Sequence, residues 1–67
     1  MAATDSRPLP THLVGLGEEV AAERAHELGW VVRVMRKGLV YPAGPFVGNR
    51  VNLHVDDRRV VLHVGRG

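Results

Sequence analysis

The stretch Glu27-Leu-Gly-Trp-Val-Val-Arg-Val-Met35 contains the change from helix to strand that decides the fold class of this chain. Before it, apolar residues recur every three or four positions from Glu18 to Leu28, which predicts an amphipathic helix. Gly29 supplies the left-handed residue that commonly ends a helix. The β-branched residues of Val31–Met35 then predict a strand, and Trp30 is expected in the core.

Two further alternating stretches, residues 51–55 and 60–64, predict two half-buried strands. The charged run Asp56-Asp-Arg-Arg59 between them predicts a tight hairpin turn. The inward side chains are predicted to be Val51, Leu53, Val55, Val60, Leu62 and Val64. The order helix, strand, long connection, strand, turn, strand predicts an α+β domain with one helix packed on one face of the sheet.

Length and composition limit what this domain can do. Its 67 residues suffice for one domain with a small core, and the lack of cysteine excludes disulfides and thiolate chemistry. The net charge of +2 is too low to favour a nucleic-acid partner. No segment approaches the roughly 20 apolar residues that cross a bilayer, and no signal peptide is evident, so no membrane partner is expected. The compartment stays open between the cytoplasm and a mature secreted form.

The first eleven residues are small, polar and proline-bearing, without any periodicity. Such composition predicts a flexible N-terminal leader over residues 1–11, followed by a folded domain over residues 12–67.

Side chains suited to catalysis or metal binding are sparse. With a turn at residues 57 and 58, His54 and His63 are expected to lie diagonally on the outward face of the hairpin. Two ligands fall short of the three or four that a zinc site needs, so no metal and no cofactor are predicted. Serine and threonine occur only within residues 1–11, which leaves no placed nucleophile, and the chain is not expected to be an enzyme.

The connection Gly38-Leu-Val-Tyr-Pro-Ala-Gly-Pro-Phe-Val-Gly48 is where function is expected. Most connections have about four to six residues, and longer ordered ones are often binding surfaces. Apolar side chains stand where solvated ones are usual, namely Leu39, Val40, Tyr41, Phe46 and Val47. Arg50 and Asn52 project to the same side of the following strand, from which their donors can reach carbonyl groups of the connection.

Five segments together resemble one protein family: Leu13-Val-Gly-Leu-Gly-Glu18, Glu27-Leu-Gly-Trp30, Val31-Val-Arg-Val-Met35, Asn49-Arg-Val-Asn-Leu-His-Val-Asp56 and Val64-Gly-Arg-Gly67. They resemble the potato-inhibitor-I-type serine protease inhibitors, and most closely the small cysteine-poor bacterial branch, in which asparagine commonly stands two residues after the arginine. The resemblance covers about Leu13 to Gly67.

The resemblance implies that the first two strands run parallel and the third antiparallel, in a mixed sheet with a long exposed binding loop between the first two strands. That loop would enter the cleft of a subtilisin- or chymotrypsin-like protease, with Arg50 and Asn52 as its support. The protease-binding residues would be Tyr41, Pro42, Ala43, Gly44, Pro45, Phe46 and Val47.

The same resemblance puts the scissile bond at Gly44-Pro45, where the family usually has a large residue followed by an acidic one. Tyr41 and Phe46 are therefore the two candidate anchors. The alternative function is a non-inhibitory interaction module that binds another protein through this loop. Oligomeric state and target enzyme are left open.

Overall fold

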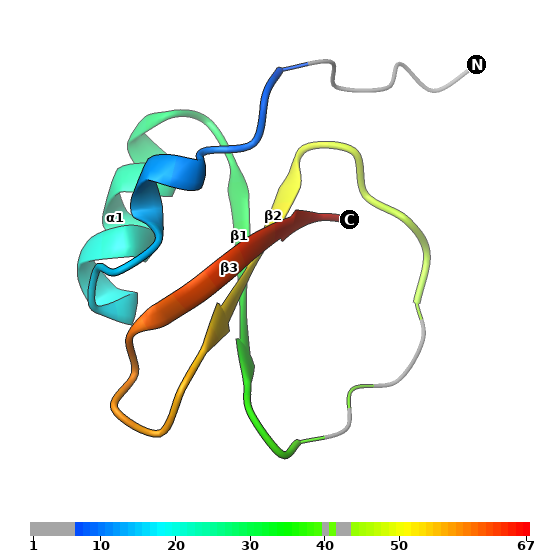
Figure 1. The fold of residues 1–67 in the computed structure, drawn as a ribbon. Coiled ribbons are helices and arrows are strands. Elements are labelled where there is room, and N and C mark those ends of the chain that lie inside the picture. Colours follow the sequence, from blue (N-terminus) through cyan, green and yellow to red (C-terminus); the bar gives the residue numbers. More distant parts are fainter. Residues whose placement is uncertain (1–6, 40, 42–43) are drawn as a thin grey trace.

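The computed structural model describes residues 7–39, 41 and 44–67, which form one α-helix and a three-stranded sheet (Figure 1). The central strand β2 (Arg50–Val55) pairs with β1 (Val31–Arg36) in parallel and with β3 (Val61–Arg66) antiparallel. The predicted α+β class is confirmed, as is the mixed sheet that the resemblance implied. The helices are the 3-10 helix η1 (Thr11–Leu13) and the α-helix α1 (Glu18–Glu27).

Helix α1 ends at Glu27, one residue earlier than predicted, with Leu28 as its C-cap. Gly29 follows in the predicted left-handed conformation, with φ of +87°. The buried residues of α1 are Ala21 and Ala25, whose small side chains let the helix backbone approach the sheet closely. No helix in the described part of the chain is long and apolar enough to cross a membrane.

The core lies between α1 and one face of the sheet, with the middle strand β2 at its centre (Figure 1). Trp30 is only 4% exposed, as predicted. The buried apolar residues are Leu13, Ala21, Ala25, Trp30, Val51, Leu53, Val55 and Val61. Because β2 has a neighbour on each side and a helix over one face, its apolar alternation predicted burial correctly.

The predicted register of β3 is wrong. Leu53 pairs with Val64 and His54 with His63, but Val55 pairs with Val61, so Leu62 is an extra residue in a β-bulge. Because of the bulge, the β3 side chains that precede it project to the opposite face of the sheet from the one predicted. Val61 is therefore buried, whereas Leu62 is 50% exposed, and the histidines lie directly opposite each other rather than diagonally.

Residues 7–11 pack more tightly than a flexible leader. Leu9 packs against the core and Pro10 is buried. The Arg7 guanidinium lies 4.2 Å from the centre of the Trp30 ring. Residues 7–11 of the predicted leader therefore contact the folded domain, and residues 1–6 lie outside the described residues.

The predicted hairpin turn is present, and one carboxylate holds it. Asp56 accepts hydrogen bonds from the backbone N–H groups of Arg58 (2.8 Å) and Val60 (3.0 Å). The bond from Val60, followed by the Arg58 backbone bond and charge, lowers the pKa of Asp56 below its usual 3.8.

Because this pKa is lowered on folding, the carboxylate stabilises the domain above pH 3.8, and that stabilisation is lost as the pH falls through the folded pKa. We expect Asp56→Ala to lower the urea midpoint of unfolding more at neutral pH than at strongly acidic pH. The neighbouring Asp57 is exposed, and Asp57→Ala serves as the control. An equal loss of stability at both pH values for Asp56→Ala would contradict this role of the carboxylate.

Candidate functional site

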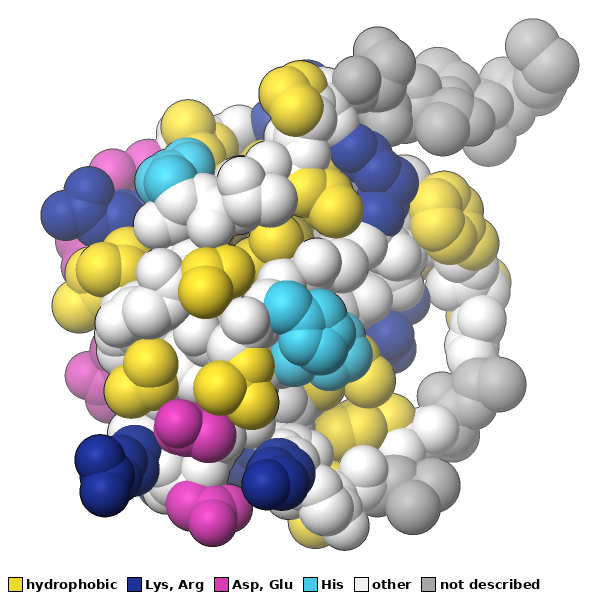
Figure 2. Space-filling model, in the orientation of Figure 1, with side chains coloured by type: hydrophobic (Ala, Val, Ile, Leu, Met, Phe, Trp, Pro, Cys, Tyr) yellow, Lys and Arg dark blue, Asp and Glu magenta, His cyan; other side chains and the backbone are white. Residues whose placement is uncertain are grey.

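The connection between β1 and β2 lies on the side of the sheet away from α1 (Figure 1). Parallel strands force the chain to return to the starting end of β1 before β2 begins. Since β1 has six residues, the return spans roughly 20 Å. Part of the unusual length of the connection is therefore required by the parallel topology. Among the described residues of the connection, 44–46 are exposed and 41, 47 and 48 are half-buried. They lie toward the right of the view in Figure 2.

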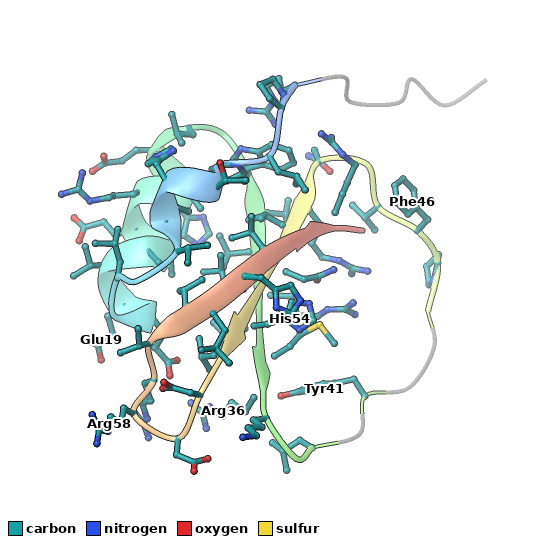
Figure 3. The ribbon with its side chains drawn as sticks, viewed as in Figure 1. Glu19, Arg36, Tyr41, Phe46, His54 and Arg58 are labelled. Carbon is teal, nitrogen blue, oxygen red and sulfur yellow. The ribbon has the colours of Figure 1, made fainter. Side chains whose placement is uncertain are left out.

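The two aromatic residues of the connection are placed differently (Figure 3). Tyr41 is half-buried, and its hydroxyl accepts a hydrogen bond of 2.7 Å from the backbone N–H of Arg36 at the end of β1. Phe46, on the part of the connection nearest β2, is 66% exposed. Tyr41 thus fastens the connection to the sheet, whereas Phe46 is presented to solvent.

The other predicted binding residues divide between exposed positions and positions that the structure does not describe. Gly44 and Pro45 are exposed, and Val47 is half-buried. Pro42 and Ala43 lie outside the described residues, as does Val40. The described part of the predicted binding stretch is therefore Tyr41 together with residues 44–47.

Arg50, the first residue of β2, lies behind this stretch. Its Nη2 donates to the carbonyl oxygens of Pro45 (3.3 Å) and Gly67 (2.7 Å), and its backbone N–H donates to the carbonyl of Val47 (3.1 Å). Its Nε is buried without a hydrogen-bond partner among the described residues. Arg50 thus ties the connection to the end of β3 through one guanidinium nitrogen.

Asn52 is placed differently from the sequence prediction, which had it reach for carbonyl groups of the connection. Its side chain is only 7% exposed, and its Oδ1 accepts a 3.0 Å hydrogen bond from Nε of Arg33. Arg33 Nη2 in turn lies 3.5 Å from the Gly67 carbonyl oxygen that Arg50 also binds. Asn52 therefore orients Arg33. Sequence reasoning missed Arg33, which parallel pairing of β1 and β2 places directly beside Asn52.

Arg66 holds the end of the connection that enters β2. Its Nη1 donates a 3.0 Å hydrogen bond to the carbonyl of Gly48, and its Nη2 donates to the carbonyl of Arg7. Its guanidinium carbon lies 5.1 Å from the centre of the Trp30 ring. Arg66 thus joins the connection, the N-terminal segment and the core aromatic, a role that its sequence position alone did not indicate.

The ring of Phe46 stands against Gly67. A Cβ atom added to Gly67 would lie 2.8 Å from Cδ2 of Phe46, which is closer than real Cβ atoms approach. Gly67 also has φ of +108°, a conformation that favours glycine. The absence of a side chain at residue 67 therefore leaves room for the exposed ring beside Gly67, whose carbonyl Arg50 and Arg33 share.

His54 and His63 form a stacked pair on the sheet, with ring centres 4.0 Å apart and an angle of 12° between the rings. Burial lowers the pKa of His54 below its usual 6.5, and the nearby charges of His63 and Arg33 lower it further. Together with Arg36 and Lys37 they border a shallow hollow of about 160 Å³. No cluster of three His, Cys, Asp or Glu side chains suited to a metal ion occurs within the described ranges.

Because the pKa of His54 is lowered on folding, its neutral form is the one that the folded domain favours. His54 therefore does not reduce the free energy of unfolding above pH 6.5. As the pH falls from 6.5 through the folded pKa, that free energy decreases. We expect the urea midpoint to fall on mild acidification in the parent and to fall less in His54→Gln. Replacement of the exposed His26 in α1 is the control and should keep the parent's pH dependence. An unchanged dependence in His54→Gln would rule out this histidine as its source.

No model of a known protein family matches this chain, and no curated protein matches it.

Proposed function

We propose that this domain is a serine protease inhibitor that presents residues 41–47 as a long exposed loop to a subtilisin- or chymotrypsin-like protease. The observation that carries the proposal is the Arg50 guanidinium, which joins the carbonyl of Pro45 to that of Gly67. It ties an exposed stretch, which has no sheet partner of its own, to the sheet. The resemblance of the sequence to potato-inhibitor-I-type inhibitors supports the same function.

Such a protease binds its substrate as an added strand in the active-site cleft, and an inhibitor loop occupies the same place. A loop that is already held in its bound shape loses little conformational entropy on binding, which favours affinity. If the protease cuts the loop, the new ends must stay together for the peptide bond to re-form. The bonds that Arg50 and Arg66 make to the carbonyls of Pro45, Val47 and Gly48 hold the later part of the loop to the sheet.

The test is inhibition of purified subtilisin and chymotrypsin by the intact domain, with a small chromogenic substrate as the reporter. We expect reversible, competitive inhibition, with the domain recovered mostly uncut after long incubation. Rapid cleavage within residues 41–47 without inhibition would show that the loop is an ordinary substrate. Absence of both inhibition and cleavage with a broad panel of serine proteases would overturn the proposal.

A second candidate is a non-inhibitory module that binds another protein through the same loop. The observation in its favour is the pair Gly44 and Pro45: one offers no side chain to a specificity pocket, and the other makes a tertiary amide at the bond where the family is cut. The double variant Gly44→Met and Pro45→Glu separates the two candidates. Inhibition that appears in the variant and is absent from the parent favours the interaction module, and equal or better inhibition by the parent favours the inhibitor.

A further inference from the structure

Resting on the proposed inhibitory function, we infer that Phe46 is the side chain that fills the specificity pocket of the target protease. The bond presented for attack is then Phe46-Val47, two residues beyond the position that the family resemblance implies. The target belongs to the class of serine proteases whose pocket is a large apolar slot, as in chymotrypsin, rather than a small pocket or one with a carboxylate at its base.

Exposure and hydrogen bonding single out Phe46. Of the two candidate anchors, Tyr41 is half-buried, with its hydroxyl on the backbone of Arg36, whereas Phe46 is 66% exposed. The Phe46 ring lies beside Gly67, where the lack of a Cβ atom leaves room for it. Burial of a large aromatic side chain is also the commonest source of a dominant contact in an interface.

The bond Phe46-Val47 is held on both sides by one residue. On the side before the bond, the Arg50 side chain binds the carbonyl of Pro45 at 3.3 Å. On the side after it, the Arg50 backbone N–H binds the carbonyl of Val47 at 3.1 Å. Cleavage between Phe46 and Val47 would therefore leave both new ends attached to Arg50. The bond Gly44-Pro45 has this attachment, within the described part of the chain, only on its later side.

The chemistry of the leaving group favours the same bond. Attack of the protease serine on the Phe46 carbonyl forms a C–O bond and breaks the C–N bond to Val47, and the serine proton passes through the protease histidine to the departing amine. That amine is primary, as in ordinary substrates. At Gly44-Pro45 the departing nitrogen belongs to the pyrrolidine ring, which is more crowded. Re-formation of the bond reverses these steps, with the Val47 amine as nucleophile.

When the pocket residue is Phe46 instead of Gly44, a shift of two residues, each loop side chain keeps its side in the protease cleft. In an extended strand, residues i and i+2 project to the same side, so Phe46 replaces Gly44 without turning the other side chains over. Pro45 then precedes the pocket residue, where its fixed φ stiffens the approach to the bond.

The inference is tested by placing an arginine at residue 46 in one variant and at residue 44 in another. Phe46→Arg should weaken inhibition of chymotrypsin by about thirtyfold or more and create inhibition of trypsin, whose pocket holds a carboxylate. Gly44→Arg, the matched control at the other exposed position, should leave trypsin without inhibition. After long incubation of the parent with chymotrypsin, mass spectrometry should find the new N-terminus at Val47.

The outcomes separate this inference from the function on which it rests. Trypsin inhibition by Gly44→Arg but not by Phe46→Arg, or cleavage before Pro45, would overturn the placement of Phe46 while the domain remained an inhibitor. If neither the parent nor either variant inhibits any serine protease, the proposed function fails and this inference fails with it. Near-UV circular dichroism of Phe46→Arg that matches the parent would show that the fold is retained, as expected for an exposed position.

Discussion

Replacement of Arg50 by alanine is expected to leave the helix and sheet folded and to make the connection about tenfold or more susceptible to proteolytic cutting. The variant loses the hydrogen bonds to the carbonyls of Pro45 and Gly67. A hydrogen bond to a charged group contributes about 1.5–3 kcal/mol when it is protected, and about 1.4 kcal/mol corresponds to a factor of ten. The backbone bond from Arg50 to Val47 survives the substitution, which limits the effect to the earlier part of the connection. Limited proteolysis with a non-target protease, followed by mass spectrometry, measures the rate and the position of cutting.

Two companion variants make the Arg50 result specific. Arg50→Lys keeps the charge, but its side chain is shorter than the reach of Nη2, the atom that donates to both carbonyls, so it should restore only part of the protection. Arg58→Ala removes an exposed charge in the turn at the other end of β2 and should leave the cutting rate unchanged. If Arg50→Ala is cut within residues 37–49 no faster than the parent, the guanidinium does not support the connection.

The helix and the central strand could be predicted because their signals are local. Gly29 ends the helix, and the strict alternation of Val51, Leu53 and Val55 matches a strand buried on one face. The bulge at Leu62 could not be predicted in the same way. Val60 to Val64 is apolar at nearly every position, so its pattern is compatible with either set of side chains pointing into the core. Only packing against the core determines that Val61 is the buried one.

The candidate site was predictable in part for a comparable reason. Arg50 is the first residue of β2, so its side chain lies close to the connection that precedes it in sequence. Its contact with the connection could therefore be predicted. The environments of Arg33 and Arg66 depend on which strands are neighbours and in which register. Asn52 was misplaced for that reason, since its partner Arg33 lies nineteen residues away in sequence and comes beside it only in the parallel sheet.

The second large effect is expected for Trp30→Ala, which should remove a large part of the free energy of unfolding and sharply lower the urea midpoint. Loss of a buried tryptophan costs about 3–5 kcal/mol, whereas a domain of this length has a total stability of roughly 3–10 kcal/mol. The ring also lies under the guanidinium groups of Arg7 and Arg66, at 4.2 and 5.1 Å. Its removal therefore disturbs the N-terminal segment and the bond from Arg66 to Gly48 together with the core. Urea unfolding followed by far-UV circular dichroism measures the change.

Controls for this prediction separate the core from the surface. Trp30→Phe keeps much of the apolar area and should fold with an intermediate loss of stability, which permits a second measurement even if the alanine variant is unfolded. Val20→Ala in α1, a residue that is 45% exposed, should change the free energy of unfolding by no more than about 0.5 kcal/mol. Because Arg66 joins Trp30 to the connection, Trp30→Phe should also speed cutting near Gly48, and Val20→Ala should not. A Trp30→Ala variant as stable as the parent would mean that the core does not depend on this ring.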